Sequence, residues 1–188
     1  MSEEGFEVPS PHDHAVEEVG HGADEFSGRI AVMTAILATL GAMFGYEGGA
    51  TQNEAALLKN DAAIKTTKAS DTWNYYQSKS NKQNLAELAL TLPNVDQEKY
   101  KADIERYKQE KEKIKSDAEK IEAEVDKLNE RSAEEMHHHH LWARATTAEQ
   151  IAISLAAITL LTRKKWLQYA AYAVAAGGIA LGAFAWFQ

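Results

Sequence analysis

The sequence contains no cysteine and only three prolines, and no basic residue precedes Arg29. The absence of cysteine excludes disulfides and thiolate metal sites. A cleavable secretory signal starts with a positive region and reaches its apolar core early, so we expect no such signal here. Eight carboxylates, four glycines and two of the three prolines fall within residues 1–28. This composition predicts a disordered acidic tail.

The common sequence patterns of enzymes are also missing. The chain has no nucleotide-binding glycine loop, no nucleophile elbow and no pair of acids that would flank a pocket. We therefore expect a protein that is not an enzyme and uses no cofactor. A net charge of −8 and long apolar runs also argue against nucleic acid as a partner.

Three apolar stretches stand out against a highly charged middle. Charge-free runs cover 30–46, 150–162 and 166–188. The first could be a buried helix of a soluble protein, but no other soluble element offers a core in which to bury it. The lengths are those of membrane-spanning helices. We predict spans at 29–47, 145–162 and 166–188.

The short loops predict how these spans are oriented. The loop Arg163–Lys165 is basic, and Arg29 directly precedes the first span. Positive residues in short loops favour the cytoplasmic side. The N-terminus is then cytoplasmic, and the central region and the C-terminus are periplasmic, in a bacterial inner membrane. Interface aromatics are expected at Trp142, Trp166, Tyr169 and Trp186.

The charged middle carries a heptad pattern from Asp96 to Glu135. Its seam has a spacing of four, three, four, three: Tyr100, Ile104, Tyr107, Lys111, Ile114, Ala118, Ile121, Val125, Leu128, Ser132 and Glu135. This spacing is typical of a coiled coil, which requires a partner helix. Residues 51–92 supply one, because Pro93 ends a helix and Asn94 or Asp96 can cap the next.

The predicted fold is therefore an all-α membrane protein. Three transmembrane helices carry a long antiparallel coiled-coil hairpin, residues 50–140 with its turn at 93–96, between the first and second spans. Residues 47–49 should break the chain before the hairpin. A turn centred near 94–95 places residue n opposite 189 − n. Expected pairs are Leu88 with Tyr100, Leu85 with Ile104, Ile64 with Val125, and Leu57 with Leu128 or Ser132. Trp73 should fall between Ile114 and Ala118, and Lys111 and Ser132 are candidates for register control.

The densest cluster of candidate binding residues is Trp73, Tyr75, Tyr76, Lys79 and Lys82. Aromatic anchors beside lysines could form a docking surface for an anionic partner. Alternatively, Trp73 and Tyr76 pack on the second arm of the hairpin and the lysines are solvated.

Two further groups could bind ions. Of the run 137–140, His137 and His140 approach one helix face and could hold Zn²⁺ or Cu²⁺ if Glu134 or a neighbouring subunit completed the site. The alternative is a titratable polar band at the membrane surface. Glu149 lies inside the second span, where a carboxylate is a functional candidate by default. It could also snorkel or pair with Arg144.

Two pairs of glycines have the small-xxx-small spacing that lets membrane helices approach closely. Gly41 and Gly45 lie in the first span, and Gly178 and Gly182 lie in the third. We expect them to serve helix packing, including self-association.

Two stretches resemble a known family. They are Trp73–Lys82, and Gln150–Ile158 followed by Leu161–Trp166. With the order of span, polar helices and two spans, they are similar to the bacterial membrane-protein family catalogued as domain of unknown function 4337, over roughly residues 25–188. The resemblance implies a small Gram-negative membrane protein and supplies no catalytic residues.

We expect a membrane-anchored coiled-coil scaffold or assembly protein. Its partners would be the bilayer, further copies of itself (a homo-oligomer), or other membrane proteins in a larger complex. The alternative function is ion or metal handling through His137–His140 and Glu149.

Overall fold

The computed structural model describes residues 25–188, which form three helices. They are α2 (Glu25–Ala89), α3 (Gln97–Thr162) and α4 (Lys165–Trp186). No strand occurs within this described range, so the all-α prediction is confirmed. Most of the predicted acidic tail lies outside the described residues. Its last positions, 25–28, are helical and belong to α2.

The predicted break at residues 47–49 is wrong, because α2 continues through all three residues. Gly48 is buried, and a Cβ atom there would lie 3.2 Å from the Cβ of Trp142. The Gly48 carbonyl oxygen also lies 2.7 Å from His139 Nδ1. The glycine therefore permits a close helix contact, and this packing outweighs its weak helix propensity.

The chain forms two compact units. One, the membrane unit, combines α2 up to Gly49 with residues 138–188. The other, the hairpin unit, is Ala50–His137. The predicted hairpin, 50–140, covers this second unit.

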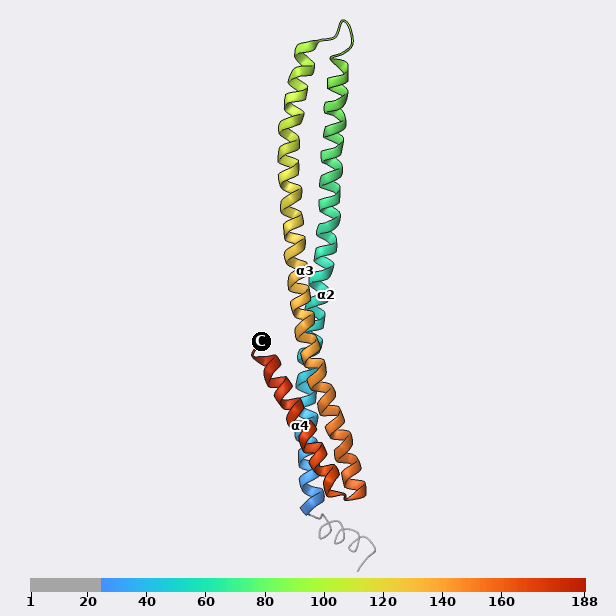
Figure 1. Cartoon of the computed structure of the whole chain (residues 1–188), viewed down its shortest axis with the longest axis vertical. Coiled ribbons are helices and arrows are strands. Elements are labelled where there is room, and N and C mark those ends of the chain that lie inside the picture. Colours follow the sequence, from blue (N-terminus) through green and yellow to red (C-terminus); the bar gives the residue numbers. More distant parts are fainter. Residues whose placement is uncertain (1–24) are drawn as a thin grey trace, which may run out of the picture. The chain divides into compact units, whose positions relative to one another are not determined.

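In the hairpin unit, α2 and α3 run antiparallel and side by side (Figure 1). Every seam position predicted on α3, from Tyr100 to Glu135, is buried or half-buried. Ile114 is 8 % exposed and Ala118 is fully buried. The heptad reading of this arm is confirmed.

Three contacts between the two arms lie within one residue of the predicted register, whereas the contacts of Trp73 with Glu122 and of Lys111 with Gln83 lie six and five residues from it. Lys59 Nζ donates to Asn129 Oδ1 at 2.7 Å. Ion pairs join Lys65 to Glu124 and Lys79 to Glu110. The residue numbers of these three pairs add to 188, 189 and 189, which matches the expected sum of 189.

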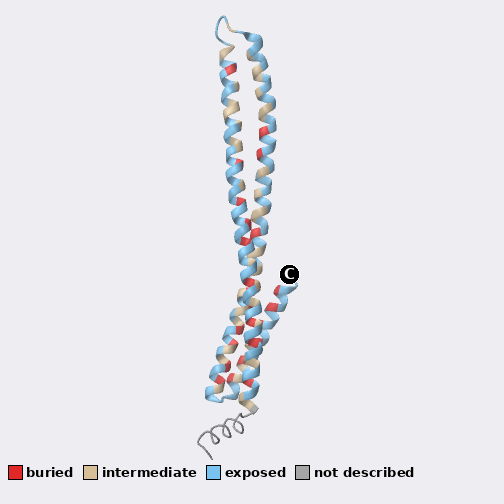
Figure 2. Cartoon of the chain, turned by 180° about the vertical axis from the view of Figure 1, so that it is seen from behind, coloured by how far each residue is buried: buried red, intermediate tan, exposed pale blue. Residues whose placement is uncertain are grey.

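The predicted seam of α2 is wrong. Leu57, Ile64, Leu85 and Leu88 are between 53 and 65 % exposed and do not face α3. The outward sides of both arms are largely exposed (Figure 2). The inward seam consists mainly of small and polar residues: Thr51, Ala55, Leu58, Ala62, Lys65, Ala69, Thr72, Tyr76, Lys79, Gln83 and Ala86. Alanines at these positions let the α2 backbone lie close to the larger side chains of α3.

The turn between the arms has the expected capping group. Asp96 Oδ1 accepts a hydrogen bond from the backbone N–H of Lys99 at 3.0 Å, and so caps the start of α3. Asn94 has a φ of 59°. Asparagine tolerates this left-handed conformation better than most residues do, which suits it to the turn.

In the membrane unit the three helices pack around small side chains. Leu37 from α2, Ala152 from α3 and Ala175 from α4 form one apolar cluster. The buried side of α4 consists of Leu167, Ala171, Ala175, Gly178, Gly182 and Ala185. All three helices are long and apolar enough to cross a membrane.

Trp142 does not lie at the outer surface of this unit. It is 4 % exposed, and its ring centroid lies 5.6 Å from that of Phe44 and 6.2 Å from that of Trp186. By contrast, Trp166, Tyr169 and Trp186 are each more than 60 % exposed, as interface aromatics require.

Candidate functional site

Glu149 is the most unusual side chain of the membrane unit. It is fully buried, and within residues 25–188 neither of its carboxylate oxygens has a hydrogen-bond partner. It does not snorkel to the surface, and no ion pair with Arg144 forms in the described chain. A buried carboxyl group without a partner is costly, so such residues in membrane segments are functional candidates.

Two of the predicted packing glycines enclose this carboxyl group. A Cβ atom on Gly178 would lie 2.6 Å from Glu149 Oε1 and 3.1 Å from the Cβ of Ala148. A Cβ atom on Gly41 would lie 3.5 Å from the Cβ of Glu149. α3 therefore inserts Glu149 between α2 and α4 at the points where both helices have no side chain.

The other two glycines differ from each other. The Phe44 ring occupies the space beside Gly182, where a Cβ atom would lie 2.7 Å from two of the ring carbons. Gly45 has open space around its Cα. Three of the four predicted glycines thus serve packing within the chain, which leaves Gly45 as the one of the four that is accessible to a neighbour.

The histidines of the run 137–140 differ in exposure and in contacts. His139 is half-buried and contacts the Gly48 carbonyl oxygen, and its ring centroid lies 5.6 Å from that of His140. His137 and His140 are exposed. Over residues 25–188, no three His, Asp or Glu side chains are grouped so that they could hold a metal ion.

The aromatic cluster of the hairpin unit is tied to α3. Trp73 Nε1 donates a hydrogen bond to Glu122 Oε1 at 2.7 Å, so Trp73 lies farther along α3 than the predicted place between Ile114 and Ala118. The Trp73 ring meets Tyr76 edge to face at 5.6 Å.

Both polar residues of the α3 seam bind across the hairpin. Lys111 Nζ lies 5.2 Å from the centre of the Tyr76 ring and donates to Gln83 Oε1 at 3.1 Å. Ser132 Oγ donates to the carbonyl oxygen of Ala55 at 2.8 Å, and this bond is buried. These directional contacts are suited to fixing the register of two helices whose apolar contacts alone would tolerate sliding.

Lys79 joins three groups of the hairpin. Its Nζ lies 2.6 Å from Glu110 Oε2, 5.1 Å from the Tyr75 ring centre and 5.7 Å from the Tyr107 ring centre. Hydrogen bonding to Lys79 lowers the pKa of the Glu110 carboxyl group from its ordinary value. Hydrogen bonding to Glu110 in turn raises the pKa of Lys79.

Of the predicted docking residues, only two remain on the surface. Tyr75 is 52 % exposed and Lys82 is also exposed, whereas Trp73, Tyr76 and Lys79 are half-buried against α3. The cluster therefore contributes mainly to the contact between the arms.

The sequence patterns did not predict an exposed apolar stripe on α2. It is defined by Leu57, Ile64, Leu85 and Leu88. We call it the outer stripe. Three of its members, Leu57, Ile64 and Leu85, are separated by multiples of seven residues. The four residues were assigned to the inner seam because a turn centred near 94–95 would place them opposite the seam of α3.

Comparison of the chain with known proteins gives one match. Searches of curated proteins and of solved structures found none. The family model described as "Domain of unknown function (DUF4337)" matches residues 26–188, and it therefore covers all but the first residue of the described chain. With its resemblance to the same family in residues 73–82 and 150–166, the chain belongs to the DUF4337 family.

Proposed function

We propose that the protein is a membrane-anchored scaffold that self-associates through its helical hairpin. In this proposal α2, α3 and α4 cross a bacterial inner membrane, with the N-terminus cytoplasmic and the hairpin and C-terminus periplasmic. The length and apolarity of the three helices support membrane anchoring. The basic loop Arg163–Lys165 supports the orientation.

The outer stripe is the observation that carries the proposal. Leu57, Ile64 and Leu85 lie at heptad-related positions on a side of α2 that α3 does not cover, with Asp71 and Ser78 at the two heptad positions between Ile64 and Leu85. Large apolar residues that repeat along one exposed helix face are typical of a helix–helix interface. Copies anchored in one membrane share one orientation, so their outer stripes can meet at the same height.

Size analysis in mild detergent tests this proposal. The wild-type chain should be an oligomer, and a triple Ser variant at Leu57, Ile64 and Leu85 should shift it to the monomer. A matched variant with Ser at Lys108, Lys115 and Glu119, all exposed on α3, should leave the oligomer unchanged. A wild-type monomer, or equal effects of the two variants, would contradict self-association through the outer stripe.

Burial of Glu149 favours a second candidate function, the handling of ions. A carboxyl group that is fully buried and has no partner in residues 25–188 could bind a proton or a cation during transport. Titration with Zn²⁺ and Cu²⁺, on wild type and on a variant with Ala at positions 137–140, tests the metal form of this idea. A micromolar or tighter site that the variant loses would favour it over the scaffold.

A further inference from the structure

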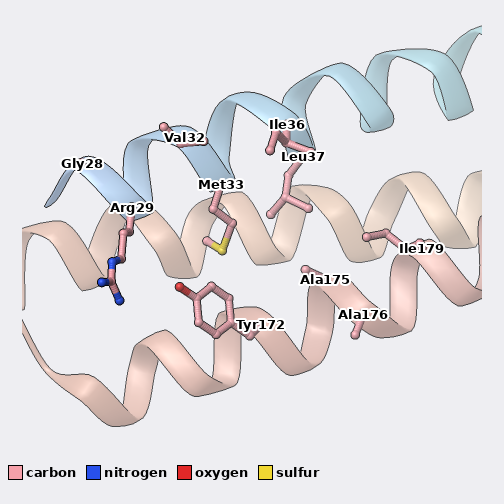
Figure 3. Close-up of a pocket in the computed structure, with 10 residues that line it drawn as sticks. All are labelled: Gly28, Arg29, Val32, Met33, Ile36, Leu37, Tyr172, Ala175, Ala176 and Ile179. Atoms are coloured by element: carbon pink, nitrogen blue, oxygen red, sulfur yellow. The ribbon is translucent and has the colours of Figure 1, made fainter. Parts of the chain in front are cut away.

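The membrane unit contains an apolar groove between α2 and α4, with a volume of about 830 Å³ (Figure 3). Met33 and Leu37 line it from α2, and Ala175 and Ile179 line it from α4. Its size falls in the range of small-molecule sites, roughly 300–1,000 Å³. The walls offer an acyl chain only hydrocarbon and thioether contacts over most of their length.

One end of the groove is polar. Figure 3 shows the Arg29 guanidinium and the Tyr172 hydroxyl at the same end, both reaching into the space between the two helices. Arg29 and Tyr172 are both exposed. Together they offer N–H and O–H donors beside the start of the apolar walls.

Three further cations belong to this end of the membrane unit. The turn between α3 and α4 lies at the same end as the start of α2 (Figure 1). This turn and the first residue of α4 supply Arg163, Lys164 and Lys165, all of which are exposed. Arg29 and these three residues therefore lie at the same end of the membrane unit.

We propose that this groove binds one anionic phospholipid. The Arg29 guanidinium and the Tyr172 hydroxyl donate hydrogen bonds to the lipid phosphate, and one acyl chain lies along Met33, Leu37 and Ala175. From Arg29 to Ile36 the groove extends about 10 Å, at ~1.5 Å per residue. That length fits within one leaflet of a hydrocarbon core that is about 30 Å thick.

The charges decide between this occupant and a second copy of the chain. A second copy in the same orientation that covered the groove would bring its own Arg29 to the same depth, so two arginine side chains would meet at the polar end. An anionic headgroup instead meets opposite charge. The lipid therefore complements both the apolar wall and the cationic end.

Lipid retention measured by native mass spectrometry tests the proposal. The full chain is mixed with phosphatidylglycerol or with phosphatidylcholine of the same acyl chains. One bound lipid and a preference of at least about fivefold for phosphatidylglycerol are expected, since one basic residue near a headgroup contributes about that factor. Arg29→Gln should reduce the preference about fivefold, and Ala176→Trp should abolish retention by filling the groove.

Two matched variants control for charge and bulk. Arg144→Gln removes an exposed arginine of α3 that does not line the groove, and Ala173→Trp adds the same bulk to an exposed position of α4 outside it. Both should retain lipid as the wild type does. Equal retention of the two lipids by the wild type, or equal effects of Arg29→Gln and Arg144→Gln, would overturn the proposal. So would a disulfide between copies that carry Cys at Ile36 or Ile179, because a second chain would then cover the groove.

Discussion

Two adjacent glycines of α4 provide a direct test of how the membrane unit packs. A Cβ atom on Gly177 would have no neighbour within 4 Å. On Gly178 it would lie 2.6 Å from Glu149 Oε1, the end of a flexible but buried side chain, and 3.1 Å from the Cβ of Ala148, which has no rotamer that would relieve the contact. The Gly177→Ala and Gly178→Ala substitutions are chemically identical and one residue apart, so they differ almost only in these contacts.

The two variants should change the unfolding free energy in opposite directions. In a helix, Ala is favoured over Gly by roughly 0.5–1 kcal/mol, and Gly177→Ala should gain that amount. Gly178→Ala gains the same term but overpacks a buried contact, which costs typically 1–3 kcal/mol. The unfolding free energies of the two variants should therefore differ by about 1–3 kcal/mol, with Gly178→Ala the less stable.

Reversible unfolding in mixed micelles, followed by far-UV circular dichroism, gives both values. Combining Gly178→Ala with Glu149→Ala closes a double-mutant cycle. The coupling energy of this cycle should reach about 0.5–3 kcal/mol. The reason is that Ala at position 149 removes the contact between the new Cβ atom at position 178 and the Glu149 carboxyl group. If the two glycine variants change the unfolding free energy equally and in the same direction, α4 does not pack on Glu149 as described.

Two further predictions concern the hairpin unit. Ser132→Ala should lower its stability by about 0.5–1.5 kcal/mol in urea titrations, because the buried bond to Ala55 is lost, whereas the exposed Ser116→Ala should have little effect. The lowered pKa of Glu110 means that its stabilising contribution is complete above its unfolded value of about 4.3 and is lost as the pH falls through the folded value. Conversely, the raised pKa of Lys79 means that its contribution is present below about 10.4 and is lost as the pH rises through the folded value. When helicity is followed during a pH titration, Glu110→Gln should therefore lose less stability at low pH than the wild type does. An unchanged titration would argue against the ion pair between Glu110 and Lys79.

Sequence patterns predicted the two arms because the heptad spacing of one arm, which is mostly apolar, continues without interruption from Tyr100 to Glu135. This α3 seam needs a partner helix. Pro93 marks a tight turn just before α3, so the residues that precede it can fold back and become that partner. The family resemblance and the candidate spans also came from the sequence. The face of α2 did not, because the pairs were derived from a turn centred near 94–95, which placed Leu57, Ile64, Leu85 and Leu88 opposite the seam of α3. In the structure Ala62 faces α3, while its neighbour Ile64 is 60 % exposed.

The contacts between helices were not predictable for a related reason. Gly48 was taken as a break because its intrinsic preference disfavours helix, but its real role depends on Trp142, ninety-four residues later in the chain. Likewise, the sequence placed Glu149 inside a span without showing that Gly41 and Gly178 would enclose it. Such roles are set by residues far apart in the sequence, which local patterns do not relate.

The two arms of the hairpin differ in what they present outward, and this difference indicates which arm assembly would use. α3 carries ion pairs along its own surface, among them Arg106 with Asp103 and Lys120 with Asp117. Its exposed positions are mainly charged and well solvated, so covering them would cost desolvation that surface pairs repay only weakly. α2 instead exposes the outer stripe, whose burial is favourable at roughly 25 cal/mol per Å² of apolar surface. An assembly of hairpins should therefore place α2 arms inside and α3 arms outside, where the charges of α3 remain in water.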